Sequence, residues 1–298
     1  MLPLVFILLN LVGGSNSTVV KFAVTHFPPL ILVALRALIA FSVLTPFVLG
    51  TRKLKLGQHA KQLLFVNLLF AANWVSFAIG IQKTSVTLSQ LMYVPTSLIV
   101  ALLSYLILKE KFTKIQVIGL TVTIFGAFIL ALESISGENL TFGDPLGNLI
   151  VFTGVICWAS YLVFSKKISN IYSPLTIIFF NFVVSFIIAL LLIPLNSSAR
   201  NFSFTNITPQ AYLSLFYIGL VASVSYFYLN QWFVKHTSAF IASLQIYPLT
   251  IIAAVLGSVF YDEVITPSLI ISALLIMSGV FIATSYNYLK GQLKWIFR

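Results

Sequence analysis

The chain has 298 residues, of which 59% are hydrophobic and 8% are charged. Soluble domains carry about 25% charged residues, so the 17 basic and 6 acidic side chains here are too few to cover the surface of an ordinary soluble enzyme. The net charge of +11 comes from basic residues between long apolar runs. This pattern is typical of charges that orient membrane helices and argues against a nucleic-acid partner.

The apolar runs predict an all-α membrane protein, because crossing a bilayer as a helix takes about 20 apolar residues. Ten such transmembrane helices are expected in chain order, at 3–22, 29–49, 62–82, 86–108, 114–132, 147–165, 174–195, 210–232, 238–260 and 267–287. The first run has neither a basic stretch before it nor a clean cleavage site, so we expect a retained helix and not a signal peptide.

Basic residues in the loops predict the orientation of these helices. With the N-terminus in the cytoplasm, the inside loops and the C-terminal tail hold 13 Lys and Arg, whereas the outside loops hold 3. An excess of this kind marks the cytoplasmic side. We therefore expect a multi-pass inner-membrane protein with both termini cytoplasmic, residues 133–146 outside and a basic tail at 288–298.

The two halves of the chain repeat each other. At a shift of 153 residues, Pro95 falls on Pro248, Glu110 on Glu263 and Gly126 on Gly279, and residues 83–126 keep 11 identities in 44 positions. The start of each half aligns at a shift of 145, which places Lys21 on Lys166. Each half holds five predicted spans, and since five is odd, the second copy enters the membrane upside down. Inverted repeats of this kind are a common architecture of alternating-access transporters.

Several of these residues resemble the EamA family of the drug/metabolite transporter superfamily. The resemblance lies in the stretch Gly14-Ser15-Asn16 leading to Lys21, in the segment from Pro29 to Arg36, and in the closing pattern of each repeat (Pro95, Glu110, Gly119 and Gly126, then Pro248, Glu263 and Gly279). It implies two EamA repeats, 1–132 and 147–287, and a carrier of small organic metabolites, often an exporter of amino acids. The second repeat departs from the first at Asn181, where the first has Arg36, and at Ser272, where the first has Gly119.

Arg36 is the most informative charge, because it lies about 10 Å into the second span at 1.5 Å per residue. An ionised group at that depth must be paired or face water. Its guanidinium could bind the carboxylate or phosphate of a substrate, or it could hold span one through Ser15, Asn16 or Ser17 and serve packing alone. The sequence leaves both interpretations open.

Buried amides and aromatic side chains within the spans predict the rest of a substrate site, since uncharged polar groups in lipid turn inward. Each of them could instead join helices without touching a substrate. The expected substrate-binding residues are Asn16, Arg36, Asn73, Trp74, Phe77, Tyr93, Trp158, Tyr161, Asn181, Tyr228, Asn230, Gln245 and Tyr247. Pro95 and Pro248 are expected to kink spans four and nine, because each removes one backbone hydrogen bond. The two kinks could flank the substrate cavity and act as hinges, or they could be static features of the packing.

Glu110 and Glu263 end spans four and nine and are read as interfacial helix caps, with proton coupling or gating as the alternative. No carboxylate lies deep in a predicted span, and no metal-ligand cluster, nucleotide-binding loop or cofactor site is expected. The sequence thus favours a secondary carrier that exports amino acids or related amphipathic solutes. An uptake or exchange carrier for a nucleotide-like or other anionic metabolite is the alternative, and a channel or an enzyme is less favoured. The expected partners are a small-molecule substrate and the lipid bilayer. The oligomeric state stays open, and a monomer is compatible with the sequence.

Overall fold

The computed structural model describes residues 2–50, 57–136, 144–205, 207–261, 267, 270–272 and 274–283, and within them the regular elements are all helices. The predicted tail 288–298 and the basic residues Arg52, Lys53 and Lys55 lie outside the described residues. In chain order the elements are α1 Leu2–His26, α2 Pro29–Gly50, α3 Ala60–Gln82, α4 Val86–Leu91, α5 Thr96–Leu103, η1 Ser104–Leu108, α6 Lys114–Ser136, α7 Pro145–Ile168, α8 Pro174–Leu192, η2 Ile193–Leu195, α9 Ser197–Arg200, α10 Pro209–Phe216, η3 Tyr217–Ser225, α11 Tyr226–His236, α12 Ala239–Ser243 and α13 Ile246–Tyr261. A shorter apolar helix follows at Ile270–Ala283.

Within the part of the chain that the structure describes, seven helices are long and apolar enough to cross a membrane: Leu2–His26, Pro29–Gly50, Ala60–Gln82, Pro145–Ile168, Pro174–Leu195, Pro209–His236 and Ala239–Tyr261. The three other predicted spans coincide with the shorter apolar helices Thr96–Leu108, Lys114–Gly126 and Ile270–Ala283. The structure thus supports a multi-pass helical membrane protein with seven long spans.

Prolines and small polar residues begin many of these helices. Ser173 and Thr208 are N-caps whose hydroxyls accept the N–H groups of Thr176 and Ala211, and each is followed by Pro at the first helical position. This arrangement satisfies one otherwise unpaired N–H and places Pro where no N–H is needed. Ordinary capping therefore explains why α8 and α10 begin where they do.

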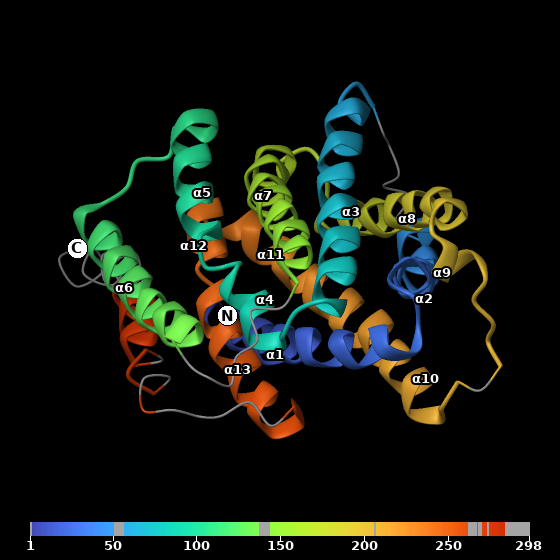
Figure 1. Cartoon of the computed structure of the whole chain (residues 1–298). Coiled ribbons are helices and arrows are strands. Elements are labelled where there is room, and N and C mark those ends of the chain that lie inside the picture. Colours follow the sequence, from blue (N-terminus) through green and yellow to red (C-terminus); the bar gives the residue numbers. More distant parts are fainter. Residues whose placement is uncertain are drawn as a thin grey trace.

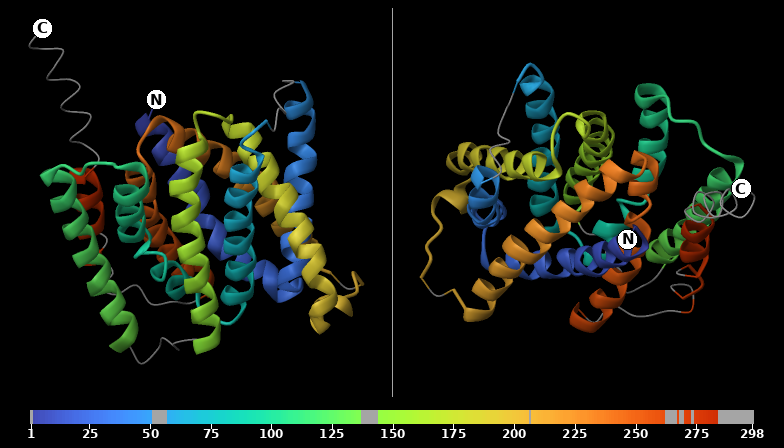
Figure 2. Two further views of the ribbon diagram at one scale, coloured as in Figure 1. Left: turned by 90° about the horizontal axis from the view of Figure 1, so that it is seen from above. Right: turned by 180° about the vertical axis from the view of Figure 1, so that it is seen from behind.

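The packing interleaves the two halves of the chain. Helix α3 packs on α7 and α8, α2 packs on α8 and η3, and α1 packs on α13. Figure 1 shows these helices crossing one another around the middle of the molecule, with α6 at one side. In Figure 2 (left), α1 begins near the end of the bundle where α2 ends, and the α1–α2 turn lies at the opposite end.

Glycines bring α6 and Ile270–Ala283 into close contact. A Cβ added at Gly119 would lie 2.6 Å from the carbonyl oxygen of Gly279, and one added at Gly126 would lie 3.0 Å from the carbonyl oxygen of Ser272. Small residues allow helix backbones to approach closely in membranes. A shift of 153 takes Gly119 to Ser272 and Gly126 to Gly279. The two contacts are therefore equivalent under the repeat, and Ser272 occupies the position that corresponds to Gly119.

Two equivalent lysines cap helix ends. Lys21 Nζ donates to the carbonyl oxygens of Ile81 (2.8 Å) and Thr84 (2.7 Å), where α3 ends. Lys166 Nζ donates to those of Val234 and Lys235 (both 3.0 Å), near the end of α11. A cation is favourable beside the free carbonyls of a helix C-terminus. The repeat relates the two lysines by a shift of 145. A shift of 153 relates the acceptor Ile81 to Val234, and Gln82, whose carbonyl oxygen lies 3.4 Å from Lys21 Nζ, to Lys235.

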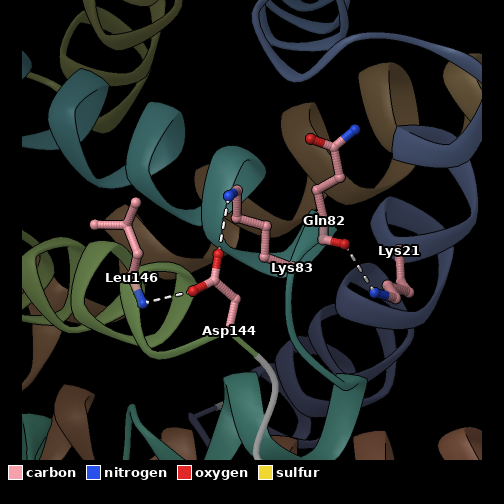
Figure 3. Close-up of polar contacts among 5 residues, drawn as sticks. All are labelled: Lys21, Gln82, Lys83, Asp144 and Leu146. Atoms are coloured by element: carbon pink, nitrogen blue, oxygen red, sulfur yellow. Dashed lines mark hydrogen bonds and ion pairs between the residues drawn. The ribbon is translucent and has the colours of Figure 1, made fainter.

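The end of α3 also binds the start of α7 (Figure 3). Lys83 Nζ lies 2.9 Å from Asp144 Oδ2, and the Asp144 Oδ1 accepts the N–H of Leu146 at 2.9 Å. The Lys83 ammonium and the Leu146 N–H hold the pKa of Asp144 below its usual range. Exposed pairs contribute little stability, so the pair mainly shows that residue 144 lies at the same end of the bundle as residue 83.

Glu110 connects the loop after η1 to the start of α12. Its Oε1 accepts the backbone N–H of Ala239 at 3.3 Å, as expected of a cap at a helix N-terminus. Burial raises the pKa of Glu110, although the Ala239 N–H and the nearby Lys166 oppose this rise. Asp262 and Glu263 lie outside the described residues.

Candidate functional site

A cavity of about 80 Å³ lies among helices from both halves of the chain. One water needs about 10–15 Å³ on this scale, so the cavity has room for several waters or a small organic solute. Its lining residues are Gly13, Asn16, Val20, Leu32, Val33, Arg36, Asn73, Trp74, Phe77, Ala78, Gln90, Tyr93, Trp158, Tyr226, Phe227, Ile246 and Leu249. A larger hollow of about 490 Å³ at one end of the bundle has Lys83 and Phe202 in its lining; because it lies near helix ends, we regard the inner cavity as the candidate site.

Arg36 is 5% exposed and crosses from α2 to the π-helix η3. Its Nε donates to the carbonyl oxygen of Ile218 (3.1 Å) and to Ser223 Oγ (2.8 Å), and its Nη2 donates to Asn16 Oδ1 (2.8 Å). In a π-helix the backbone hydrogen bonds follow the i→i+5 pattern. Within η3, Arg36 donates hydrogen bonds to one backbone carbonyl and one side-chain hydroxyl.

The guanidinium also lies over the indole of Trp74, with 4.2 Å between Arg36 Cζ and the ring centroid. This is cation–π distance. The ring and the hydrogen bonds together fix the arginine at the cavity wall. Arg36 therefore joins helices, as the packing interpretation expects, and it also lines the cavity, while substrate binding by Arg36 stays a prediction.

The corresponding position in the second repeat carries a neutral version of the same contact. Asn181 Nδ2 of α8 donates to the hydroxyl of Tyr161 in α7 at 2.7 Å, as Arg36 of α2 donates to Asn16 of α1. The shift of 145 relates both partners. Gln231 Nε2 also donates to the Tyr161 hydroxyl, at 2.5 Å. The residues of this second network do not line the cavity. The positive charge of Arg36 is therefore contributed by the first repeat alone.

Asn73 joins three helices at the cavity. Its Nδ2 donates to the Tyr93 hydroxyl (2.6 Å) and to the carbonyl oxygen of Gly154 (2.9 Å). Gly154 has no Cβ, and one added there would meet Asn73 Nδ2 at 3.4 Å. The tighter contact of such a Cβ would be with Ser76 Cβ, at 3.2 Å, so the glycine allows α3 and α7 to pack closely at this point.

Aromatic rings form the apolar wall of the cavity. Phe227 lies 5.5 Å from Trp74 and 6.1 Å from Trp158 between ring centroids, and Phe77 lies 5.8 Å from Tyr93. Edge-to-face contacts of this kind hold the rings in defined positions. An apolar wall with a few fixed polar groups is typical of sites for small organic ligands.

Seven of the thirteen residues predicted for the substrate site line this cavity: Asn16, Arg36, Asn73, Trp74, Phe77, Tyr93 and Trp158. The other six do not. Tyr161 and Asn181 bond each other behind it, and Tyr228 is 41% exposed on the outside of the bundle. Asn230, Gln245 and Tyr247 are buried elsewhere, with Tyr247 hydrogen-bonded to Ser97. Substrate binding by any of the thirteen stays a prediction.

The two prolines lie beside breaks in their spans. Residues 92–95 separate α4 from α5, so Pro95 precedes α5, whereas residues 244 and 245 separate α12 from α13 and Pro248 lies in the first turn of α13. Gln90 and Tyr93 at the first break and Ile246 at the second line the cavity. A hinge role of the prolines stays a prediction.

Sequence reasoning missed several lining residues, including Tyr226, Phe227 and Ile246. Applying the repeat would have found them, because a shift of 153 takes Asn73, Trp74 and Tyr93 to these three positions. The same logic at a shift of 145 takes Gly13 to Trp158. Val20, Leu32 and Leu249 carry no polar signal that sequence could single out.

Comparison with known proteins finds similar sequences and a similar fold. The sequence profile described as "EamA-like transporter family" matches residues 2–132 and 145–285. The uncharacterized transporter YyaM of Bacillus subtilis (strain 168) is 26% identical over 284 residues, covering 92% of each chain. The probable amino-acid metabolite efflux pump of Escherichia coli (strain K12) is 24% identical, covering 93% of this chain and 92% of its own. One crystal structure superimposes with a TM-score of 0.75 at 16% identity, covering 94% of this chain and 95% of that one, and shares the fold.

Proposed function

Because the chain belongs to the EamA-like transporter family, we propose that it is a secondary carrier that exports amino acids or related small amphipathic metabolites by alternating access. One observation carries the proposal. A cavity with aromatic walls and a few fixed polar groups lies between helices of both halves, where two repeats that rock against each other would alternately expose it.

The architecture that goes with this function has ten spans in two inverted repeats, with repeat one at 1–132 and repeat two at 147–287. Seven long and three shorter apolar helices supply ten segments. The matched lysine caps, the paired contacts at Arg36 and Asn181, and the crossing of Gly119 with Gly279 support the repeat. The protein would lie in a bacterial inner membrane, with both termini on the cytoplasmic side.

Amino acids are the proposed substrates on two grounds. The name of the Escherichia coli relative refers to amino-acid metabolite efflux, and the cavity combines apolar rings with amides and a guanidinium. Net export would follow the concentration gradient of the solute, since the carboxylates lie outside the middle of the predicted spans.

Counterflow in proteoliposomes tests the function. Vesicles loaded with unlabelled amino acids should accumulate labelled amino acid transiently and saturably. Trp158→Ala should reduce this exchange at least several-fold by removing a cavity wall, whereas Phe216→Ala, on a side chain 58% exposed at the outer surface, should leave it near wild type. A flux that never saturates would instead indicate a channel.

A further inference from the structure

The cavity contains one charged side chain with no countercharge. Among the described residues that line the cavity, Arg36 alone has a side chain that is charged at neutral pH. The Arg36 partners described by the structure are all neutral: backbone carbonyls, Ser223, Asn16 and the Trp74 ring. Within the described residues, Arg36 Nη1 donates no hydrogen bond. One edge of the guanidinium is therefore left for another acceptor.

Among the side chains that the structure describes, no acid is placed to supply that acceptor. Among the described side chains, Glu110 accepts from Ala239 and Asp144 pairs with Lys83, and both lie at ends of helices. Glu133, Glu138, Asp262 and Glu263 lie at or beyond the ends of the predicted spans. A buried charge without a countercharge is energetically costly. An anion bound at Arg36 would supply the countercharge and remove this cost, which favours its binding.

The cavity offers no matching site for a cation. Its aromatic rings could attract an ammonium group, but Trp74 already faces the guanidinium, and the other polar lining groups are amides and hydroxyls without charge. An ammonium within the same small space would also meet the Arg36 charge. A zwitterion thus gains from its carboxylate and loses from its ammonium.

The cavity favours a small molecule. Its volume of about 80 Å³ is well below the roughly 300–1,000 Å³ typical of sites for drug-sized ligands, so the apolar group attached to the carboxylate should be compact.

We propose that the preferred substrates are small organic anions, in which a carboxylate binds Arg36 Nη1 and a compact apolar group packs on Trp158 and Phe227, without an ammonium group. This inference rests on the proposed carrier function. Within the proposed class of amino acids and related small amphipathic metabolites, it selects the deaminated relatives of amino acids, such as branched 2-oxo acids.

Three molecules with the same isopropyl group test the proposal. They are 3-methyl-2-oxobutanoate, which is an anion, valine, which is a zwitterion, and isobutylamine, which is a cation. Binding to the purified full-length protein is measured by thermal shift against ligand concentration, because a ligand that binds only the folded state raises its apparent stability. Inhibition of labelled-valine counterflow by each molecule gives a second readout.

The oxo acid should bind about tenfold or more tightly than valine, because the valine ammonium would lie near the like-charged Arg36 guanidinium in a partly desolvated space. Isobutylamine should not bind, because it has no carboxylate to accept a charge-assisted hydrogen bond from Arg36. Arg36→Gln should remove the preference for the oxo acid, and Arg36→Lys should restore part of it. Lys61→Gln, which removes an exposed charge outside the cavity, should keep it. If Arg36→Gln does not fold, the ligand series on the native protein decides.

Valine binding as tightly as the oxo acid would overturn the anion preference and leave the carrier function standing. Failure of the oxo acid to bind while labelled amino acids still exchange would do the same. Absence of exchange for every solute would instead contradict the proposed function itself.

Discussion

At the scale of single residues, the two halves use equivalent positions for different purposes. Arg36 and Asn181 occupy matching places, and each donates to its neighbour on the preceding helix. Only Arg36 also lines the cavity. The sequence showed that the second arginine is missing, but it could not show which side of the pair faces the cavity, because that depends on how η3 and α7 pack.

Tyr161 is predicted from the sequence to bind substrate, but its contacts indicate a structural role. Its hydroxyl accepts from both Asn181 and Gln231, yet it lies outside the cavity lining. Tyr161→Phe leaves two buried amides without an acceptor, so it should lower the free energy of unfolding by roughly 1–3 kcal/mol. Thermal unfolding in detergent checks this. A substrate affinity lowered tenfold with unchanged stability would contradict the structural role.

Two matched glycine substitutions at the same scale should have opposite signs. Gly119→Ala places a Cβ 2.6 Å from the Gly279 carbonyl oxygen and from the Ala283 nitrogen, and overpacking of this kind costs about 1–3 kcal/mol. Gly50→Ala meets nothing within 4 Å, and Ala is favoured over Gly in helices by up to about 1 kcal/mol. Melting temperatures of the two variants provide the comparison. An equal response of both variants would show that α6 does not cross Ile270–Ala283 this closely.

At the scale of elements, hydrophobic length predicts most of the helices and proline predicts the region of each break. What sequence could not give is the form of the breaks. Span four separates into α4, α5 and η1, and the eighth span runs through the π-helix η3. These forms depend on tertiary acceptors, such as Arg36 at the Ile218 carbonyl, that no local pattern shows.

The lysine caps at the element ends should matter for stability. Lys21→Met keeps most of the aliphatic stem but removes donors to the carbonyls where α3 ends, and Lys166→Met does the same at α11. Each should lower the free energy of unfolding by about 1–2 kcal/mol. Thermal unfolding of both variants is the measurement, with Lys61→Met as control. No effect at either position would contradict the capping role.

Glu110 should give the protein an element-scale pH dependence. Its pKa is raised by burial in the folded state, so the folded protein binds the proton more tightly than the unfolded chain. The stability linked to Glu110 is therefore present at low pH and is lost as pH rises through the raised pKa, above the ordinary glutamate value of about 4.3. The melting temperature of the native protein minus that of the Glu110→Gln variant should decrease as pH rises across this window. An increase of this difference with pH would contradict the raised pKa.

At the scale of the whole molecule, the contacts between distant segments follow the repeat. Helix α1 packs on α13 as α5 packs on α7, and α2 packs on η3 as α3 packs on α8. The pair of Lys83 with Asp144 places residue 144 at the end of the bundle where α3 ends. The internal shift of 153 residues predicted equivalent positions, while their meeting around one cavity required the fold.

The inverted arrangement is the claim on which the shared cavity and the carrier mechanism depend. Thr25 and Asn170 are equivalent under the shift of 145. Thr25 lies in the last turn of the α1 helix, Asn170 lies just after α7, and both are exposed. In a protein whose single cysteine is removed by Cys157→Ala, single cysteines at these two positions report the side of the membrane. The measurement is labelling by a membrane-impermeant maleimide, in intact cells and after permeabilisation. We predict that Thr25→Cys is labelled in intact cells and Asn170→Cys only after permeabilisation; labelling of both from the same side would contradict the inverted repeat.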